Sequence, residues 1–572
     1  MKKRTYVIIL ILIFIGLILA AAASLFFLSF NRGPSIPASA YLRIDLSGPL
    51  VDYPETGFWA SLVQGGRTLS IHEIWTSLRK AKIDPRIQGV FVKFGLLECD
   101  WAKCAEVRDA LLDFRRSGKT TVAYFEEMPE ADKEYYLATA CERIVIHPLG
   151  WIGISGMGGY VPFFKKGLDK LGIRAEFEHI EEFKTAYNQF TETGFTPAHR
   201  EMTASLLQSR FEDYVQAVAA ARKKSVEEIR TLIDRAFFQG DQAKEAGLVD
   251  EVLYEDQAVA FFSANGRPAS PLSLETYGRI DPVSLGLNTG RRIALIYGQG
   301  PIHGGASLVQ TMGSDTVVEW FRAAREDSSI LAVVFRVDSP GGSAVASDAI
   351  WREIQLTRKK KPVVVTMSDM AGSGGYWVAM GANKIVAQPQ TLTGSIGVLS
   401  GKFDISGLAE KLGITSEKIA LGKRADLFSP FRPLSPEERA LFRKQILWIY
   451  ERFLAQAAEG RNMTPEAVDR VGKGRVWTGR QAKELGLVDE LGGLPKAIET
   501  AKELAGLSRE EEVRLVVWPK RTSFFRSLFG RGPAETKNGL SEILPRSLRA
   551  ALDWALRLNA ERVWAVMPFL PE

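Results

Sequence analysis

Ser395 stands in a glycine-rich stretch, residues 392–401, that reads LTGSIGVLSG. An earlier stretch, PLGWIGISGMG, shares its G-x-I-G frame but has Trp151 at the position of Ser395. A serine hydroxyl becomes a nucleophile when a neighbouring group takes its proton, whereas an indole ring has no such chemistry. The two stretches therefore differ in whether they hold a side chain that could take part in covalent catalysis.

Two adjacent glycines, Gly341 and Gly342, follow a predicted strand at residues 331–337 in the sequence DSPGGS. Glycines at a strand end let backbone N–H groups turn into a cleft without side chains in the way, and such groups can form an oxyanion hole. A plain strand-to-helix turn would explain the same segment. The corresponding place after residues 91–94 reads GLLECDW, without Pro-Gly-Gly. Only the later segment is therefore equipped to hold an anionic intermediate.

Ser373, in the segment AGSGG, is a rival nucleophile because the segment loosely resembles a nucleophile elbow. A serine of that type needs a histidine as its base. Four of the five histidines fall in the first half of the chain, and His303 precedes the strands that would form the site. We therefore interpret Ser373 as the start of a glycine-rich helix that packs beside the site.

The elements that position these residues alternate between helix and strand. Apolar residues at helical spacing predict amphipathic helices, and continuous apolar runs predict buried strands. Strands that alternate with helices are typical of parallel βαβ units. In the second half of the chain, helices are expected at residues 315–325 and 347–356, and strands at 331–337, 362–367 and 384–387.

The chain contains an internal duplication. Residues 240–252 read GDQAKEAGLVDEV, and residues 479–491 read GRQAKELGLVDEL. The offset between the copies shrinks from 252 residues at their opening glycines, Gly48 and Gly300, to 239 residues at these closing segments. Each copy also has a cap followed by proline, at Thr196 and at Ser435, that predicts the start of a long helix. A period this long indicates two homologous domains and not a solenoid.

Composition limits the classes of function. The chain of 572 residues is 46% hydrophobic and 24% charged, which is typical of globular domains. Its net charge of +6 is small and not gathered on one face, so nucleic-acid binding has no electrostatic support. The three cysteines, Cys99, Cys104 and Cys141, do not form a zinc motif and are interpreted as small core residues.

The N-terminus predicts a membrane anchor. Residues 6–30 carry no charge, which is enough to cross a bilayer that needs about 20 residues. Lys2, Lys3 and Arg4 precede them, which favours a cytoplasmic N-terminus. A cleaved signal peptide is the alternative, because small residues occupy positions 20–24. We assign residues 1–32 as an uncleaved anchor, with the rest of the chain outside the cytoplasm.

The motifs DSPGG, AGSGGYW and LTGSIGV, in this order and duplicated behind an anchor, resemble the long form of the signal peptide peptidase A (protease IV) family. The resemblance covers about residues 40–505. It implies an α/β fold of two tandem Clp protease/crotonase-like domains with repeated β-β-α units, at residues 40–260 and 290–505. Residues 506–572 would form a C-terminal extension. In that family the catalytic serine lies in the G-S-I-G motif, which implies that Ser395 is the nucleophile.

The resemblance also implies a lysine as the base. Single-domain relatives carry a G-K-x-K-D segment whose second lysine is the base, and the second copy has Ala425 in that slot. The first copy reads EFKTA and places Lys184 there. Lys423 is a minor alternative and is interpreted as a surface lysine. Each copy would then supply one half of a dyad, which explains why Trp151 replaces the serine in the first copy.

The implied activity is that of a membrane-anchored serine endopeptidase that hydrolyses cleaved signal peptides and other hydrophobic peptides. The resemblance implies no cofactor and no metal, a homotetramer, and a location in the bacterial inner membrane with the catalytic domains on the periplasmic side. An acyl-CoA enzyme of the crotonase type and a noncatalytic membrane scaffold are the alternatives. A predicted amphipathic run at residues 540–566 would lie on the membrane or on a partner subunit.

Overall fold

The computed structural model describes residues 36–54, 68–263, 267–520 and 564–567. The anchor expected at residues 1–32 lies outside these ranges, and so does nearly all of the amphipathic run expected at residues 540–566. Within the described ranges, no helix is both long enough and apolar enough to cross a bilayer.

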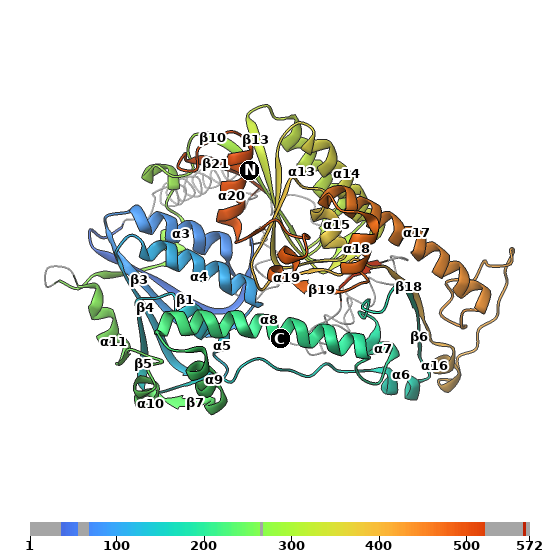
Figure 1. The fold of residues 1–572 in the computed structure, drawn as a ribbon, viewed down its shortest axis with the longest axis horizontal. Helices are drawn as coiled ribbons and strands as arrows, with labels where there is room; N and C mark the ends of the chain where they lie inside the picture. Colours follow the sequence, from blue (N-terminus) through green and yellow to red (C-terminus); the bar gives the residue numbers. More distant parts are fainter. Residues whose placement is uncertain (1–35, 55–67, 264–266, 521–563, 568–572) are drawn as a thin grey trace, which may run out of the picture.

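The first half of the chain forms a mainly parallel sheet (Figure 1). Its strands follow the order β2-β1-β3-β4-β5-β7, and only β7 pairs antiparallel, with β5. Both β1 and β3 are long and largely apolar, as expected for strands that are covered on both faces. The strands of this sheet are β1 (Ala40–Val51), β2 (Leu69–Ser70), β3 (Ile87–Glu98), β4 (Thr120–Met128), β5 (Arg143–Gly153), β7 (Phe237–Gln239), β8 (Glu251–Val252) and β9 (Ser270–Ser273).

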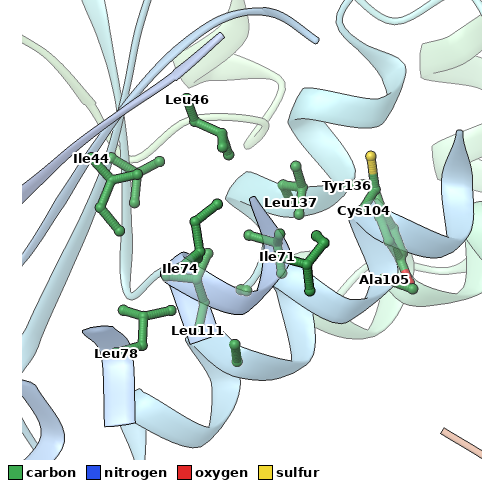
Figure 2. Close-up of a cluster of buried hydrophobic side chains, with 14 of the residues drawn as sticks. Ile44, Leu46, Ile71, Ile74, Leu78, Cys104, Ala105, Leu111, Tyr136 and Leu137 are labelled. Carbon is green, nitrogen blue, oxygen red and sulfur yellow. The ribbon is translucent and has the colours of Figure 1, made fainter. Parts of the chain in front are cut away.

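Helices α3 (Ile71–Ile83), α4 (Trp101–Arg115) and α5 (Asp132–Ala138) cover one face of this sheet (Figure 1). Figure 2 shows Ile44 of β1 close to Ile74 of α3, within a cluster that also includes side chains of α4 and α5. The same apolar cluster continues into Leu295 of the second half of the chain. The two halves therefore share one buried core across their boundary.

The second half repeats this architecture in a sheet of order β19-β17-β15-β13-β10-β21. As in the first sheet, one strand pairs antiparallel: β19, at the end of the sheet, pairs with β17. The strand β21 adds residues of the C-terminal extension to the sheet. The strands are β10 (Arg291–Gln299), β13 (Ile330–Ser339), β15 (Val363–Gly372), β16 (Lys384–Ala387), β17 (Leu392–Gly394), β19 (Val476–Thr478), β20 (Glu490–Leu491) and β21 (Val513–Trp518).

The predicted elements of this half are confirmed, although one strand is longer than predicted. The helices predicted at residues 315–325 and 347–356 are α13 (Ser314–Glu326) and α14 (Ala344–Arg358). The strand predicted at residues 384–387 is β16. Strand β15 continues beyond residue 367 to Gly372, and the short helix α15 (Gly374–Ala379) then begins with Ser373 at its N-cap position, as predicted. The strand continues because Met370, Ala371 and Gly372 pair in parallel with β17.

The two long helices begin as their sequences predict. Thr196 caps α8 (Pro197–Arg222), and Ser435 caps α17 (Pro436–Arg461) with a reciprocal capping box. Helix α8 belongs to the first half of the chain but extends along the molecule to β19 of the second half (Figure 1). The remaining helices are α6 (Lys165–Leu171), α7 (Asn188–Thr191), α9 (Val226–Arg235), α10 (Gly240–Glu245), α11 (Glu255–Ala258), η1 (Val259–Phe262), α12 (Leu274–Gly278), η2 (Pro282–Leu285), α16 (Ser406–Lys411), α18 (Pro465–Val471), α19 (Gly479–Glu484) and α20 (Leu494–Leu504).

A third sheet joins segments that are far apart in the sequence. It has the order β12-β11-β14-β22-β18-β6. Strand β6 comes from the first half, β14 and β18 come from the second half, and β22 lies close to the end of the chain. Its strands are β6 (Arg174–His179), β11 (Ile302–His303), β12 (Met312–Gly313), β14 (Gly341–Ser343), β18 (Leu399–Asp404) and β22 (Trp564–Val566).

Candidate active site

Lys184 and Ser395 lie in direct contact within one chain. The Nζ of Lys184 is 3.0 Å from the Oγ of Ser395 and 3.0 Å from its carbonyl oxygen. Both residues are completely buried. The two side chains that the sequence proposed as base and nucleophile are therefore brought together, one from each half of the chain.

The ladder between β6 and β18 brings the two residues together. These strands pair antiparallel, from Asp404 opposite Arg174 to Leu399 opposite His179. Lys184 follows the end of β6 after a short loop, and Ser395 lies just before the start of β18. Because an antiparallel pair brings the end of one strand beside the start of the other, this ladder sets Lys184 next to Ser395.

Burial controls the chemistry of Lys184. Two glycines contact its side chain so closely that an added Cβ would lie 3.1 Å from Lys184 Cδ at Gly397 and 2.6 Å from Lys184 Cβ at Gly474. This enclosure removes water from the amine and lowers its pKa well below the ordinary value of 10.5. The hydrogen-bonding neighbours of the amine are uncharged oxygens, so they do not restore the charged form. Gly397 belongs to the G-S-I-G motif, whereas Gly474 has no recognisable motif.

Ser395 is held by its backbone. Its N–H donates to the carbonyl oxygen of Arg475 at 2.7 Å, and its φ of 52° lies in the left-handed region. Non-glycine residues adopt this conformation at a cost of roughly 1–3 kcal/mol, and such residues cluster at functional sites. The guanidinium of Arg475 stacks on Phe183 and on Trp477. The segment that fixes Ser395 therefore also packs against the residue before Lys184.

Ser373 is also part of the site. The Nζ of Lys184 donates to its Oγ at 2.7 Å, and its N–H donates to the carbonyl oxygen of Gly394 at 2.8 Å. Ser373 has a φ of 54°, so it too has a left-handed backbone. The Ser373 hydroxyl contacts the amine of Lys184. A nucleophile elbow would instead need a histidine as the base of this serine. The sequence placed Ser373 beside the site but did not reveal this contact with the amine.

Gly341 and Gly342 form strand β14 near the start of α15, and both have positive φ, 99° and 155°. The N–H of Gly341 donates to Ser339 Oγ at 3.1 Å. An added Cβ at Gly374 would lie 3.1 Å from the nitrogen of Gly342, so β14 lies directly against the segment that carries Ser373. Their assignment as an oxyanion hole stays a prediction.

The residues that the sequence analysis set aside lie elsewhere. Trp151 lies in β5 opposite Gln239, and its ring is 5.6 Å from that of Phe237. The side chain of Lys423 is 78% exposed and is 3.3 Å from the carboxylate of Glu437. The interpretation of Lys423 as a surface lysine is therefore confirmed.

A buried ionic cluster supports the site from the boundary between the halves. Lys103 of α4 contacts Asp338, next to the Ser-Pro-Gly-Gly segment, at 2.6 Å and Asp369 at 3.0 Å. Burial raises the pKa of Asp338 to about 6, although the Lys103 ammonium opposes the shift. Burial alone would lower the pKa of Lys103. The neighbouring carboxylates together have a larger, opposite effect, so the pKa of Lys103 is raised and the amine stays charged. Asp338 is the first residue of the DSPGG motif, but no motif indicated its partners Lys103 and Asp369.

A second buried set lies next to the first. Arg336 is 1% exposed and contacts Asp52 at 2.8 Å and Glu106 at 2.7 Å. Asp52 and Glu106 come from the first half of the chain, and Arg336 comes from β13 of the second half. Both ionic sets therefore link the first half to the strand that leads into β14.

Comparisons with known proteins agree with the duplication. The profile described as Peptidase family S49 matches the chain twice, at residues 113–265 and 355–508. The chain is 36% identical over 459 residues to "Serine protease SPPA, chloroplastic" of Arabidopsis thaliana, which covers 78% of this chain and 68% of that protein. It is 33% identical over 495 residues to "Protease 4" of Salmonella typhi, which covers 82% and 79%. "Protease 4" of Haemophilus influenzae is 28% identical over 94% of this chain and 91% of that protein.

Among solved structures, a ClpP1 variant from Listeria monocytogenes aligns with 36% of this chain and 94% of its own. The identity is 16% and the TM-score is 0.25. A likeness this low carries no weight for the fold.

Proposed function

The chain belongs to peptidase family S49, and from that premise we propose that it hydrolyses peptides with Ser395 as nucleophile and Lys184 as general base. The observation that carries this proposal is the contact of 3.0 Å between Lys184 Nζ and Ser395 Oγ in a fully buried setting. A lysine can act as a base only in its neutral form, and burial favours that form.

A neutral amine has two N–H groups and one lone pair, and three oxygen atoms surround Lys184 Nζ. Ser373 Oγ and the Ser395 carbonyl oxygen would accept the two N–H groups. The Ser395 hydroxyl would then donate to the lone pair. In this arrangement Ser373 orients the amine so that its lone pair faces the nucleophile.

In the first half-reaction, Ser395 Oγ forms a bond to the carbonyl carbon of the peptide while Lys184 Nζ takes the hydroxyl proton. The resulting ammonium gives this proton to the leaving nitrogen, and the C–N bond breaks to leave an acyl ester on Ser395. Water then attacks the ester as Lys184 takes a proton from it. The ester C–O bond breaks, and the proton returns to Ser395.

We propose that the backbone N–H groups of Gly341 and Gly342 stabilise the oxyanion, for which the Gly341 N–H would leave its present acceptor, Ser339 Oγ. Positive φ values at both residues and the close packing of Gly374 against β14 support this role. Removal of one oxyanion-hole donor, measured for a side-chain amide in a serine peptidase, lowers kcat by about 10²–10³-fold.

The proposed substrates are hydrophobic peptides, including cleaved signal peptides. Apolar side chains next to the dyad support this class. Phe183 precedes Lys184 and packs with Met202, Leu392 and Val476. A Clp protease/crotonase-like fold for each half and a homotetramer belong to the same proposal.

We also propose a single-pass location in the bacterial inner membrane with the catalytic domains on the periplasmic side. The uncharged residues 6–30 behind Lys2, Lys3 and Arg4 support this topology. A reporter fused after Glu572 should be active outside the cytoplasm, and cytoplasmic activity would refute the orientation.

A serine-reactive probe tests the proposed chemistry directly. The purified full chain is treated with a fluorophosphonate, and the labelled residue is identified by mass spectrometry. Labelling of Ser395 that disappears in Lys184→Ala supports the dyad. An unlabelled Ser395 in a folded protein would refute it and would favour the acyl-CoA enzyme or the scaffold.

A further inference from the structure

The strand β22 (Trp564–Val566) lies between β14 and β18 in the third sheet. It pairs antiparallel with β14, where Val566 is opposite Gly341 and Ala565 is opposite Gly342. It also pairs antiparallel with β18 through Leu399. The N–H of Met567 continues the ladder by donating to the carbonyl oxygen of Pro340 at 2.8 Å. A segment from the end of the chain thus pairs with both strands that border the candidate site.

The side chain of Met567 fills an apolar site beside the dyad. Met567 is 4% exposed and packs with Phe183, the neighbour of Lys184, and with Leu392. Its Sδ lies 2.5 Å from the position that an added Cβ would take at Gly372. Gly372 pairs with Gly394, the residue before Ser395. Met567 therefore packs against Gly372, which is paired with the residue that precedes Ser395.

Extended peptides bind to many proteins by adding a strand to an open sheet edge, with backbone hydrogen bonds for affinity and side-chain pockets for specificity. Strand β22 forms backbone pairs of the same kind, but on both sides, with β14 and with β18. It pairs with Gly341 and Gly342, the residues that the proposed mechanism needs for the oxyanion, and it places one apolar side chain in a buried pocket. A substrate peptide cannot pair with this stretch of β14 while β22 is paired with it.

We propose that residues 564–567 are an internal competitor of the substrate, bound in the substrate cleft in the manner of an extended hydrophobic peptide. This inference rests on the proposed peptidase function, because its consequence is a lower apparent affinity of the enzyme for its substrate. The segment is covalently linked to the second sheet, which ends at β21 (Val513–Trp518). Because the segment belongs to the same chain as the site, its binding is intramolecular and does not depend on the bulk concentration, so even weak pairing competes with a dilute substrate.

Met567→Asp in the full chain tests the proposal, because it would bury a carboxylate without a partner in an apolar site. We expect the KM for a short fluorogenic hydrophobic peptide to fall at least about tenfold, the equivalent of about 1.4 kcal/mol, with kcat nearly unchanged. Ala565→Pro is the second variant, because it removes a backbone N–H from the middle of β22. Leu149→Asp is the matched control, since Leu149 is 83% exposed and lies in β5. An unchanged KM in both β22 variants would overturn the proposal.

A binding measurement separates this proposal from the peptidase function. A fluorescent peptide with the sequence of residues 561–572 is titrated into full-length Ser395→Ala and into Ser395→Ala with Met567→Asp. We expect tighter binding to the second protein, because its cleft is no longer occupied by its own segment. Equal affinities of the peptide for the two proteins would overturn the proposal that residues 564–567 compete with the substrate. If the wild-type chain hydrolyses no peptide but this difference in affinity is found, the proposed peptidase function is wrong and the proposal that residues 564–567 occupy the cleft still holds.

Discussion

The Nζ of Lys184 lies 3.0 Å from the Oγ of Ser395, across the boundary between the two halves of the chain. Trp151 stands in the first half at the position of Ser395, and the family resemblance places Ala425 in the second half at the position of Lys184. Strand β6 of the first half pairs with β18 of the second, which makes the contact a consequence of the shared sheet. Two copies of one domain thus form a single candidate site.

The first prediction separates the two serines of the site. Ser395→Ala should lower kcat by about 10⁴-fold or more, because it removes the nucleophile. Ser373→Ala should lower kcat by about tenfold, because it removes one hydrogen bond to the Lys184 amine. Single-turnover hydrolysis of a fluorogenic peptide measures both. Equal and severe losses in the two variants would contradict the assignment of Ser373 as an orienting residue.

The second prediction concerns the pH dependence of activity. Only neutral Lys184 can take the proton, so kcat/KM should rise by about tenfold per pH unit and then level off above the pKa of Lys184. Burial lowers this pKa well below 10.5, so the plateau should begin well below that pH. A rate profile of the folded enzyme measures the midpoint. A profile that continues to rise up to pH 10.5 would mean that the base is an ordinary exposed lysine.

The third prediction concerns the pH dependence of stability. Unfolded Lys184 binds a proton below its ordinary pKa of 10.5, whereas folded Lys184 stays neutral down to its lowered pKa. Between these two values folding releases a proton, so the free energy of unfolding rises with pH by about 1.4 kcal/mol per unit. Lys184→Met lacks this slope.

The thermal midpoint of Lys184→Met should therefore exceed that of the wild type by a margin that grows as pH falls from 10.5 to the lowered pKa. Below the lowered pKa the margin should stay constant, because both states are then protonated. Differential scanning calorimetry at several pH values measures it. A margin that does not change with pH would show that Lys184 is charged in the folded protein.

The fourth prediction concerns the ionic cluster at the boundary between the halves. Lys103→Met would leave Asp338 and Asp369 buried without their cation, which typically destabilises a protein by about 3–5 kcal/mol. The loss should shrink toward acidic pH, because Asp338 has a pKa raised to about 6 and becomes neutral below it. Calorimetry at neutral and acidic pH measures the effect.

Lys82→Met is the control for this variant. The pair of Lys82 with Asp113 has side chains 31% and 43% exposed, and exposed pairs contribute only about 0–1 kcal/mol. Equal losses in the two variants would contradict a special role for the buried cluster.

Much of the fold could be predicted from local patterns. The continuous apolar run at residues 384–387 is strand β16, and the cap at Ser435 starts the long helix α17. These features depend on a few neighbouring residues, so they are visible in the sequence. The duplication predicts more than any single motif does. The replacement of the serine by Trp151 in the first copy indicates that the two copies do not each hold a complete site. Lys184 itself came from the family resemblance.

The rest of the site depends on contacts between distant segments. Gly474 encloses the Lys184 side chain, and Lys103 bridges two carboxylates of the other half, yet neither residue belongs to a recognisable motif. The pairing of β22 with β14 joins the end of the chain to the candidate site. The sequence around residue 565 gives no indication of this partner, because the two strands are more than 200 residues apart and no short turn joins them. Strand β15 extends beyond its predicted end at residue 367 for a related reason, because it pairs with β17 through Gly372.

The most direct test of the shared dyad is a double-mutant comparison of peptide hydrolysis. Lys184→Ala, Ser395→Ala and the double variant are measured in the full chain, with Lys423→Ala as the control and with folding checked by circular dichroism. We predict nearly equal losses in all three dyad variants, because residues that act as one unit are strongly non-additive, and a near-normal rate in Lys423→Ala. A near-normal rate in Lys184→Ala together with loss of activity in Lys423→Ala would contradict the account, because the second half would then contain a complete site.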